Sequence, residues 1–363
     1  MRARLPFRHR AQSPDIVPSP DSRLARDSAV ACSDFALSAD STTTCRRRFL
    51  ASALSSAAGV TLAGAAQLPL SLATVASSFL PLPAFAGDSK AIVATPLADN
   101  LFLLSGAGAN VVAATGPDGL VLVDGGLEKH SKDLVKAALQ ATKTRRVTTL
   151  FNTHWHPEQT GSNEPLGKSG AKIISHVNTK LWLTRRITVG WRPRTYGPFD
   201  TRALPSDTFY STANMTLGDE HVDYGYLAQA HTDGDLYVFF RNANVLVGGG
   251  VVSADRWPIL DYETGGWIAG LVAGLDSLIQ LADDQTRIVP ADGPVLTRAD
   301  LQAQRASYFT IYQRLVKCVT QGLSPAEALA TDPAKGINPQ WGDPQPFLTM
   351  AFKSLWGHLA PDA

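Results

Sequence analysis

Two histidines, one residue apart, follow directly after an apolar, β-branched run, and this feature constrains the fold more than any other. Residues 147–152 predict a strand, and the segment 154–161, His-Trp-His-Pro-Glu-Gln-Thr-Gly, begins just beyond it. At a strand end, His154 and His156 can turn their imidazoles to the same face. Neutral imidazole is the usual zinc ligand in proteins. The segment therefore predicts a metal site at the edge of a sheet.

A third histidine, His231, lies between two further predicted strands, in the run Ala-His-Thr-Asp-Gly-Asp at 230–235. Three histidines supply the protein ligands of an open catalytic zinc site and leave a position for water. The pKa of such a water falls from about 15.7 to about 7. The alternative without a metal site is that His154 and His156 are ordinary surface loop residues. Asp233 and Asp235 either orient His231 or simply form the turn, and the Thr-Asp-Gly-Asp pattern favours the turn.

Strand-like and helix-like segments alternate along the chain in two successive sets, each richer in strands at its start. This order predicts two sheets packed face to face with helices outside, a four-layer α/β sandwich of αββα type. Residues 187–213 show no period, and we expect a long loop there that forms the rim or lid of a pocket. The strands are expected at 92–104, 110–114, 120–124, 147–152, 171–175, 227–230, 236–240, 245–248 and 287–289, and the helices at 131–142, 178–186, 267–281 and 297–321.

Charge and cysteine usage narrow the range of partners. The formal net charge of the 363 residues is only +1, whereas nucleic-acid-binding proteins usually carry a basic surplus. We therefore expect a small-molecule substrate and no nucleic-acid partner. Cys32 and Cys45 lie near the N-terminus, so Cys318 is the single thiol of the remaining chain, and we expect it in a helix core.

The N-terminal part has the composition of a leader. Residues 1–45 are rich in Ser, Asp, Pro and Arg without apolar periodicity, which predicts disorder. Residues 46–86 resemble a twin-arginine export signal, with Arg46 and Arg47 before a Phe-Leu pair and a weakly apolar run that ends at Ala84-Phe85-Ala86. This predicts a periplasmic or otherwise exported protein, a transient partner in the twin-arginine export machinery, and no membrane insertion after cleavage. The alternative is an uncleaved membrane anchor.

Over about residues 92–320 the chain resembles the metallo-β-lactamase superfamily. Residues 151–163 are similar to its His-x-His-x-Asp-His-x-Gly signature, and residues 245–250 and 288–294 are similar to the segments that deliver its last metal ligands. The resemblance implies that residues 87–363 form one αββα domain. It also implies that Asp124 is a buried residue that braces the histidine loop, and that His154, His156 and His231 bind the first of the family's two metal ions.

The positions of the second metal site depart from the family pattern. Glu158 and Gln159 replace an aspartate and a histidine, Gly250 replaces the bridging acid, and Asp292 replaces the last histidine. Glycine cannot bridge two metals, and Gln159 is a poor zinc ligand beside imidazole. The resemblance therefore implies one zinc ion, with Asp292 as a further candidate ligand. The carboxylates of Glu158 and Asp292 would suit a harder ion if one bound.

The predicted function is metal-dependent hydrolysis of an ester, thioester or amide such as a lactam, with Glu158 orienting water as the general base. Two alternatives stay open. In the first alternative, the catalytic site has decayed, and the chain is a periplasmic accessory protein that binds a metal or a ligand without turnover. A weaker alternative is a redox or lyase activity that uses iron or manganese through the added carboxylates.

Overall fold

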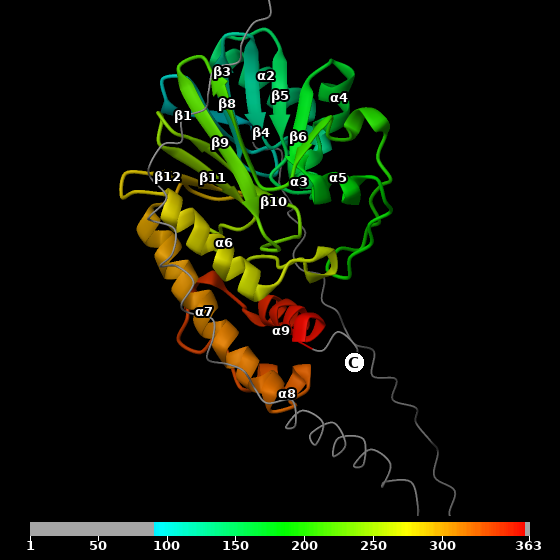
Figure 1. Ribbon diagram of the computed structural model, residues 1–363, viewed down its shortest axis with the longest axis vertical. Coiled ribbons are helices and arrows are strands. Elements are labelled where there is room, and N and C mark those ends of the chain that lie inside the picture. The colour runs from blue at the N-terminus through cyan, green and yellow to red at the C-terminus, as the bar shows by residue number, and fades with distance from the viewer. Residues whose placement is uncertain (1–90, 360–363) are drawn as a thin grey trace, which may run out of the picture. The chain divides into compact units, whose positions relative to one another are not determined.

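The apolar, β-branched runs of the chain pair into two sheets in the computed structural model, which describes residues 91–359 (Figure 1). The predicted N-terminal extension at 1–45 and the predicted export signal at 46–86 lie outside the described residues. Among the described helices, none combines the length and apolar character needed to cross a bilayer.

The first sheet mixes antiparallel and parallel pairing. Its strands pair in chain order, antiparallel from β1 to β4 and parallel from β4 to β7. Parallel neighbours need crossover connections, and each of the three connections contains a helical segment. The strands are β1 (Val93–Ala98), β2 (Leu101–Ser105), β3 (Val111–Gly116), β4 (Gly119–Val123), β5 (Val147–Phe151), β6 (Lys172–His176) and β7 (Asp207–Phe209).

The second sheet has the order β12-β11-β10-β9-β8. Its strands pair antiparallel except for β11 and β12, which run parallel with helix α6 between them in sequence. The strands are β8 (Thr212–Leu217), β9 (Glu220–Leu227), β10 (Asp235–Phe240), β11 (Val245–Gly249) and β12 (Arg287–Pro290).

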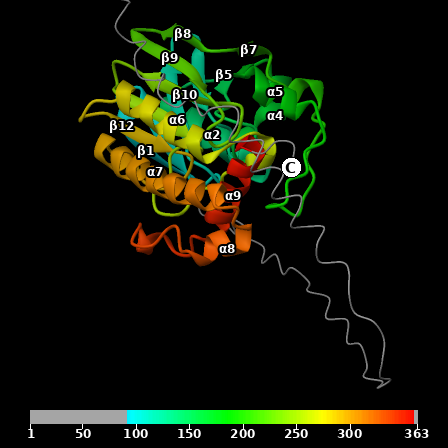
Figure 2. The same ribbon diagram turned by 60° about the horizontal axis from the view of Figure 1, so that its bottom comes forward.

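Helices cover the outer faces of both sheets, as Figures 1 and 2 show. On the first sheet these are α2 (Ser131–Thr142), α3 (Pro157–Thr160), α4 (Asn163–Lys168) and α5 (Val177–Leu183), with short 3-10 turns at Glu128–His130 and Thr201–Ala203. On the side of the second sheet lie α6 (Ile268–Leu281), α7 (Arg298–Thr320) and α9 (Gln345–Leu359), with 3-10 turns at Tyr262–Thr264 and Pro339–Trp341, and α8 (Pro325–Ala330) packs against α7 and α9. The helix α7 starts where Thr297 and Asp300 form a reciprocal capping box.

Three hydrophobic clusters fill the spaces between four layers. One lies between α2 and the first sheet and includes Leu134 and Leu122. A second joins the two sheets, where Phe151 meets Tyr224 edge to face with ring centroids 4.9 Å apart. The third lies between the second sheet and α6, α7 and α9. Each fully buried apolar side chain of this size stabilises the fold by about 1.5–3 kcal/mol. The predicted αββα sandwich is confirmed.

The structure corrects several expected boundaries. The strand predicted at 92–104 is a hairpin, because Asp99 and Asn100 form a two-residue turn inside it. The segment 187–213 already contains β7 and the start of β8. The strand predicted at 227–230 ends at Leu227, and most of β8 and β9 was missed because their apolar residues alternate with polar ones on a half-exposed edge. Helices α8 and α9 were not predicted.

Candidate metal centre

Loops from both sheets meet at one edge of the sandwich. The strands β4, β5, β11 and β12 end there, and β10 starts there because it runs antiparallel to β11. Asp124 follows β4 directly, the histidine loop follows β5, and Asp292 follows β12. The topology therefore brings the histidine loop together with His231, which lies 75 residues later in the chain.

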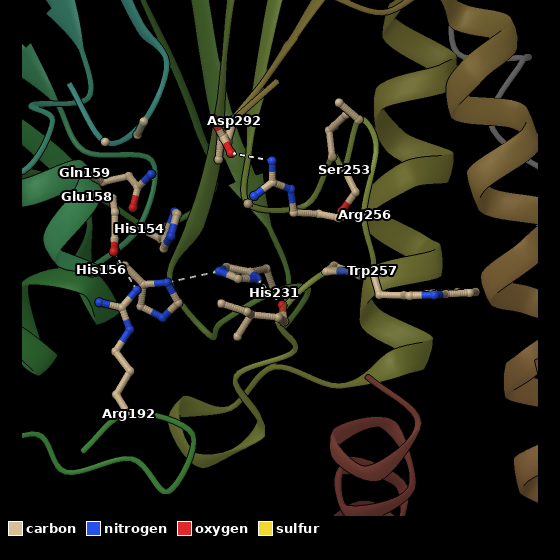
Figure 3. Close-up of a pocket in the computed structure, with 18 residues that line it drawn as sticks. His154, His156, Glu158, Gln159, Arg192, His231, Ser253, Arg256, Trp257 and Asp292 are labelled. Atoms are coloured by element: carbon tan, nitrogen blue, oxygen red, sulfur yellow. Dashed lines mark hydrogen bonds and ion pairs between the residues drawn. The ribbon is translucent and has the colours of Figure 1, made fainter. Parts of the chain in front are cut away.

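The imidazoles of His154, His156 and His231 form a compact triad. Their candidate ligand atoms all lie within 4.8 Å of one another, and all three residues are buried. The ring centroids are 4.5–4.8 Å apart, with the rings turned edge to face. Figure 3 shows the three side chains converging on one side of the pocket. The structure therefore brings together all three histidines singled out from the sequence.

A relay of hydrogen bonds orients His154. Asp124 is buried, and it accepts hydrogen bonds from the backbone nitrogen of Thr153 (2.8 Å) and from its hydroxyl (2.9 Å). Since that hydroxyl donates to Asp124, its oxygen accepts from Nδ1 of His154, 3.1 Å away. The proton then sits on Nδ1, and the lone pair of Nε2 is left for a metal. Burial raises the pKa of Asp124, and the two hydrogen bonds from Thr153 act in the opposite direction because they stabilise the charged carboxylate. The bracing role that the resemblance implied for Asp124 has this physical basis.

The other two histidines are held by acceptors outside the triad. Nε2 of His156 lies 3.0 Å from a carboxylate oxygen of Asp261, and Nδ1 of His231 lies 2.6 Å from the carbonyl oxygen of Ile259. A carbonyl oxygen can only accept, so Nδ1 of His231 carries the proton. Each ring therefore turns its unprotonated nitrogen inward.

The inward nitrogens fit a cation. Nδ1 of His156 and Nε2 of His231 are only 3.2 Å apart, and both carry lone pairs in the tautomers assigned above. Burial lowers the pKa of His156 well below 6.5 and that of His231 to about 4, so a shared proton does not hold them together at neutral pH. Facing lone pairs repel unless a positive charge lies between them, and second-sphere acceptors on the far nitrogens are typical of metal-ligating histidines. The donor set of three neutral imidazoles suits zinc.

Glu158 lies beside the triad, but its charge is compensated. Its side chain is 10% exposed, and Oε1 accepts a 2.6 Å hydrogen bond from the Arg192 guanidinium, whose side chain is 15% exposed. Gln159 is buried next to it on the short helix α3, and its backbone oxygen accepts from Gly125 and Asn152. Glu158 and Gln159 both line the pocket.

Gly250 and Asp292, the remaining positions singled out from the sequence, contribute no ligand atom to the triad. A Cβ added to Gly250 would come within 2.4 Å of Cδ2 of His231, so the ring occupies the space that a side chain would need. Asp292 lines the same pocket, but its half-exposed carboxylate pairs with Arg256 at 3.2 Å. The cluster of possible metal ligands among residues 91–359 includes the three histidines and not Asp292.

Asp235 organises the loop that carries His231 and does not touch its ring. One carboxylate oxygen accepts from the backbone nitrogens of His231 (2.6 Å) and Thr232 (2.7 Å), and the other accepts from the Thr232 hydroxyl. Asp233 points elsewhere and accepts from the indole of Trp182 at 2.6 Å. These contacts agree with the turn-forming role that the sequence favoured.

The pocket measures about 630 Å³ including its open mouth, and one wall is the loop at 252–259. Its Trp257 stacks on Phe347 of α9, with ring centroids 5.5 Å apart, and its indole donates to the carbonyl of Gly342. Gln304 of α7 accepts from the backbone nitrogen of Ser253. The C-terminal helices thus fix the loop whose Ile259 orients His231.

The sequence did not single out three residues that contact the triad or the pocket's carboxylates, namely Asp261, Arg192 and Arg256. Nothing in the local sequence pattern linked Asp261 to His156, from which it is 105 residues away in the chain. Arg192 and Arg256 lie in irregular loops, where neither spacing nor periodicity assigns a contact. The only available signal was the expectation that 187–213 forms a pocket rim, which Arg192 meets by lining the pocket.

Comparisons with known proteins agree with this geometry. A family model described as the metallo-beta-lactamase superfamily matches residues 105–303. Metallo-beta-lactamase type 2 of Bacillus cereus is 23% identical over 178 residues, which are 49% of this chain and 64% of the relative. The counterpart from Bacillus sp. (strain 170) is 22% identical over 178 residues, 49% of this chain and 63% of its own length. The chain thus spans less than two thirds of these relatives.

Solved structures share the fold at low sequence identity. A double mutant of the sec-alkyl sulfatase PisA1 aligns with a TM-score of 0.57 and 13% identity, covering 75% of this chain and 51% of its own. The metallo-beta-lactamase IND-7 aligns with a TM-score of 0.51 and 19% identity, covering 61% of this chain and 100% of its own. The family model matches more than half of the residues of this chain. The chain therefore belongs to the metallo-beta-lactamase superfamily.

Proposed function

We propose that this protein is a mononuclear zinc-dependent hydrolase that cleaves an ester, a thioester or an amide such as a lactam. The observation that carries the proposal is the pair of inward lone pairs on His156 and His231, 3.2 Å apart, with His154 beside them. Such a site is built for one cation and holds three neutral ligands, as in open catalytic zinc sites.

When bound, zinc supplies a Lewis acid that polarises a carbonyl and lowers the pKa of water. The residues of the chain do the rest. Arg192 fixes Oε1 of Glu158, and Oε2 makes no hydrogen bond to residues 91–359, so this oxygen can accept a proton from water. The three histidines and Glu158 are buried, so solvent screens the electrostatic interactions among them less than at the surface.

Elemental analysis of the freshly purified mature protein, residues 87–363, tests the metal assignment. We expect about one zinc per chain, and none in the triple variant His154→Ala/His156→Ala/His231→Ala. Unchanged metal content in the triple variant would sink the site assignment, and a redox metal such as iron would favour the lyase or redox alternative.

Hydrolysis of a panel of generic esters, thioesters and lactams tests the role of Glu158. Loss of a general base lowers kcat by about 10²–10⁴-fold, so we expect Glu158→Gln to do so with zinc content retained. Glu164→Gln, an exposed carboxylate on α4 that pairs with Lys168, is the matched control. Glu158→Asp keeps the negative charge opposite Arg192. This variant replaces Glu158→Gln in the test if Glu158→Gln does not fold.

The ion pair with Arg192 favours a second candidate function, because it engages the carboxylate that would act as base. In that case the domain is an accessory protein that binds metal or ligand without turnover. Stoichiometric zinc together with no hydrolysis on the whole panel would support this candidate over the hydrolase.

We also propose that the protein is exported by the twin-arginine machinery and cleaved before Gly87. The support is the sequence alone, through Arg46, Arg47 and the Ala-Phe-Ala end of the leader. Replacing both arginines by lysine should retain the full-length protein in the cytoplasm, and the N-terminus of the exported protein should be Gly87 by mass spectrometry. Export of the lysine variant would refute the proposal.

A further inference from the structure

Positive charge is concentrated in the segment 178–206, which contains most of α5 and the loop that follows it and is called the basic segment below. It holds six Lys and Arg residues and a single acid, Asp200. The other residues of 91–359 hold 17 Lys and Arg against 24 Asp and Glu. The chain is close to neutral because a basic segment offsets an acidic body. Such a separation of charge favours an anionic partner at the basic segment.

Most arginines of the basic segment face solvent. The exposed ones are Arg185, Arg186, Arg194 and Arg202. The salt bridges among residues 91–359 involve other cations, and Asp200 caps the turn Thr201–Ala203. A guanidinium presents a planar fork of N–H donors that matches phosphate oxygens. These four side chains can therefore contact phosphate groups of a partner.

The apolar residues of the basic segment hold it against the body of the protein. Leu183, Ile187 and Val189 are buried in a cluster with Trp155 of the histidine loop. The backbones of Ile187 and Tyr196 pair as an isolated antiparallel bridge. Because the apolar side chains turn inward, the arginines occupy outward positions. The basic segment is thus a folded platform that presents its charges in a fixed arrangement.

The basic segment lies beside the C-terminal end of α9. Figures 1 and 2 both show the loop after α5 close to that end of the helix. Contacts to the turn Tyr262–Thr264 join the two. The backbone nitrogen of Gly190 donates to a carboxylate oxygen of Glu263 at 2.5 Å, and the ammonium of Lys353 on α9 lies 5.6 Å from the centre of the Tyr262 ring. The basic segment and the end of α9 therefore belong to one surface.

Large apolar side chains are exposed on both flanks of this surface. On α9, Trp356 is 40% exposed and Leu359 is 53% exposed. On α5, Leu181 is 48% exposed, and it lines a small hollow together with Arg185. Arginine beside exposed Trp and Leu is typical of surfaces that lie on membranes, where the apolar groups enter the headgroup region. A nucleic-acid backbone would engage the arginines but would leave these aliphatic side chains in water.

We propose that the basic segment and the end of α9 dock the folded protein on a bilayer rich in anionic phospholipid. The arginines contact the lipid phosphates, while Trp356 and Leu359 bury their exposed parts among the headgroups. Arg192 of the same segment lines the pocket, so docking brings the pocket close to the bilayer. The docking requires neither a bound metal nor hydrolysis, so it stands or falls independently of the function proposed above.

Co-sedimentation with lipid vesicles tests the proposal. Residues 87–363 contain all the described strands, helices and hydrophobic clusters, so this form is used and the arginine-bearing leader is left out. We expect it to bind vesicles of equimolar phosphatidylglycerol and phosphatidylcholine but not vesicles of phosphatidylcholine alone. In Arg185→Gln/Arg186→Gln/Arg194→Gln the partition coefficient should fall on the order of 100-fold, because each basic residue near an anionic surface contributes about fivefold.

Lys143→Gln/Arg145→Gln/Arg146→Gln is the matched control. It removes the same number of exposed cations from the turn between α2 and β5, at the opposite end of β5 from the histidine loop. This variant should bind the vesicles as the wild-type protein does. Trp356→Ala should weaken binding by roughly fivefold, since less apolar surface is buried among the lipids.

A wild-type protein that does not bind the anionic vesicles, or an equal loss of binding in the control variant, would overturn the proposal. Binding retained in the triple arginine variant would do the same. Binding to a double-stranded oligonucleotide without vesicle binding would make nucleic acid the partner instead. Thermal melts check that each variant folds, and if the triple variant does not, Arg186→Gln alone should lower the partition coefficient by about fivefold.

Discussion

Two groups of polar residues that line the pocket are stabilised in different ways. In the first group, His154, His156 and His231 are neutral, and each has its outer nitrogen engaged so that its inner lone pair is free. In the second group, Glu158 pairs with Arg192 and Asp292 pairs with Arg256. The first group is complete only with a cation, whereas the carboxylates of the second are already paired. This difference predicts one metal ion at the triad and none beside Glu158 or Asp292.

The largest effect is expected from removing one member of the triad. His231→Ala should weaken zinc binding on the order of 1,000-fold, because only two ligands remain. Zinc at 1,000 times its Kd should stabilise the wild-type protein by about 4 kcal/mol, which raises the Tm of a domain of this size by roughly 10 °C. The variant should show no such shift in a thermal melt. His221→Ala, an exposed histidine on β9, should behave as wild type, and an equal loss there would point to nonspecific binding.

Restoring an acid at the position that lacks one should damage the first site and not rebuild the second. In Gly250→Asp the new Cβ collides with His231, so the ring must move off the carbonyl of Ile259. We expect zinc affinity to fall by about 100-fold, at the upper end of effects seen for disturbed ligand orientation. Ala254→Asp adds a carboxylate to the same pocket and is the control. Two zinc ions per chain in Gly250→Asp would break the comparison.

A tautomer change should weaken the first site without moving a ligand. In Asp124→Asn the amide can donate to the Thr153 hydroxyl, which then donates to Nδ1 of His154 and places the proton on the inward Nε2. Changes of this kind lower metal affinity by about 10–100-fold. Competition with a chromogenic chelator measures the loss, with Asp133→Asn on the exposed face of α2 as control. Wild-type affinity in Asp124→Asn would refute the relay.

The smallest effect is expected at the rim. Asp292→Asn removes one partner of a half-exposed ion pair, and such pairs contribute about 0.2–1 kcal/mol. Zinc affinity in the same chelator competition should change by less than about threefold, since Asp292 is not a ligand in this arrangement. A loss of tenfold or more would instead make Asp292 the fourth protein ligand that the sequence suggested.

The sequence was most informative where a motif sits at the end of a strong strand. The run at 147–152 is apolar and β-branched, so both the strand and the position of His154 and His156 followed from local patterning. It was least informative for β8 and β9, where polar residues interrupt the apolar ones, and for Arg192, which lies in a loop without period. Local preferences do not encode contacts that depend on packing between distant segments.

The sequence by itself determined the layered fold, the three candidate ligands and the loss of the usual second-site residues, because these depend on residue type and order. Only the tertiary structure decided what became of that second site. Arg192 and Arg256 reach Glu158 and Asp292 from loops 34 and 36 residues away in the chain, and the ring of His231 fills the space beside Gly250. Charge compensation and steric exclusion act through space, so they appear only once the two sheets have brought their loops to the same edge.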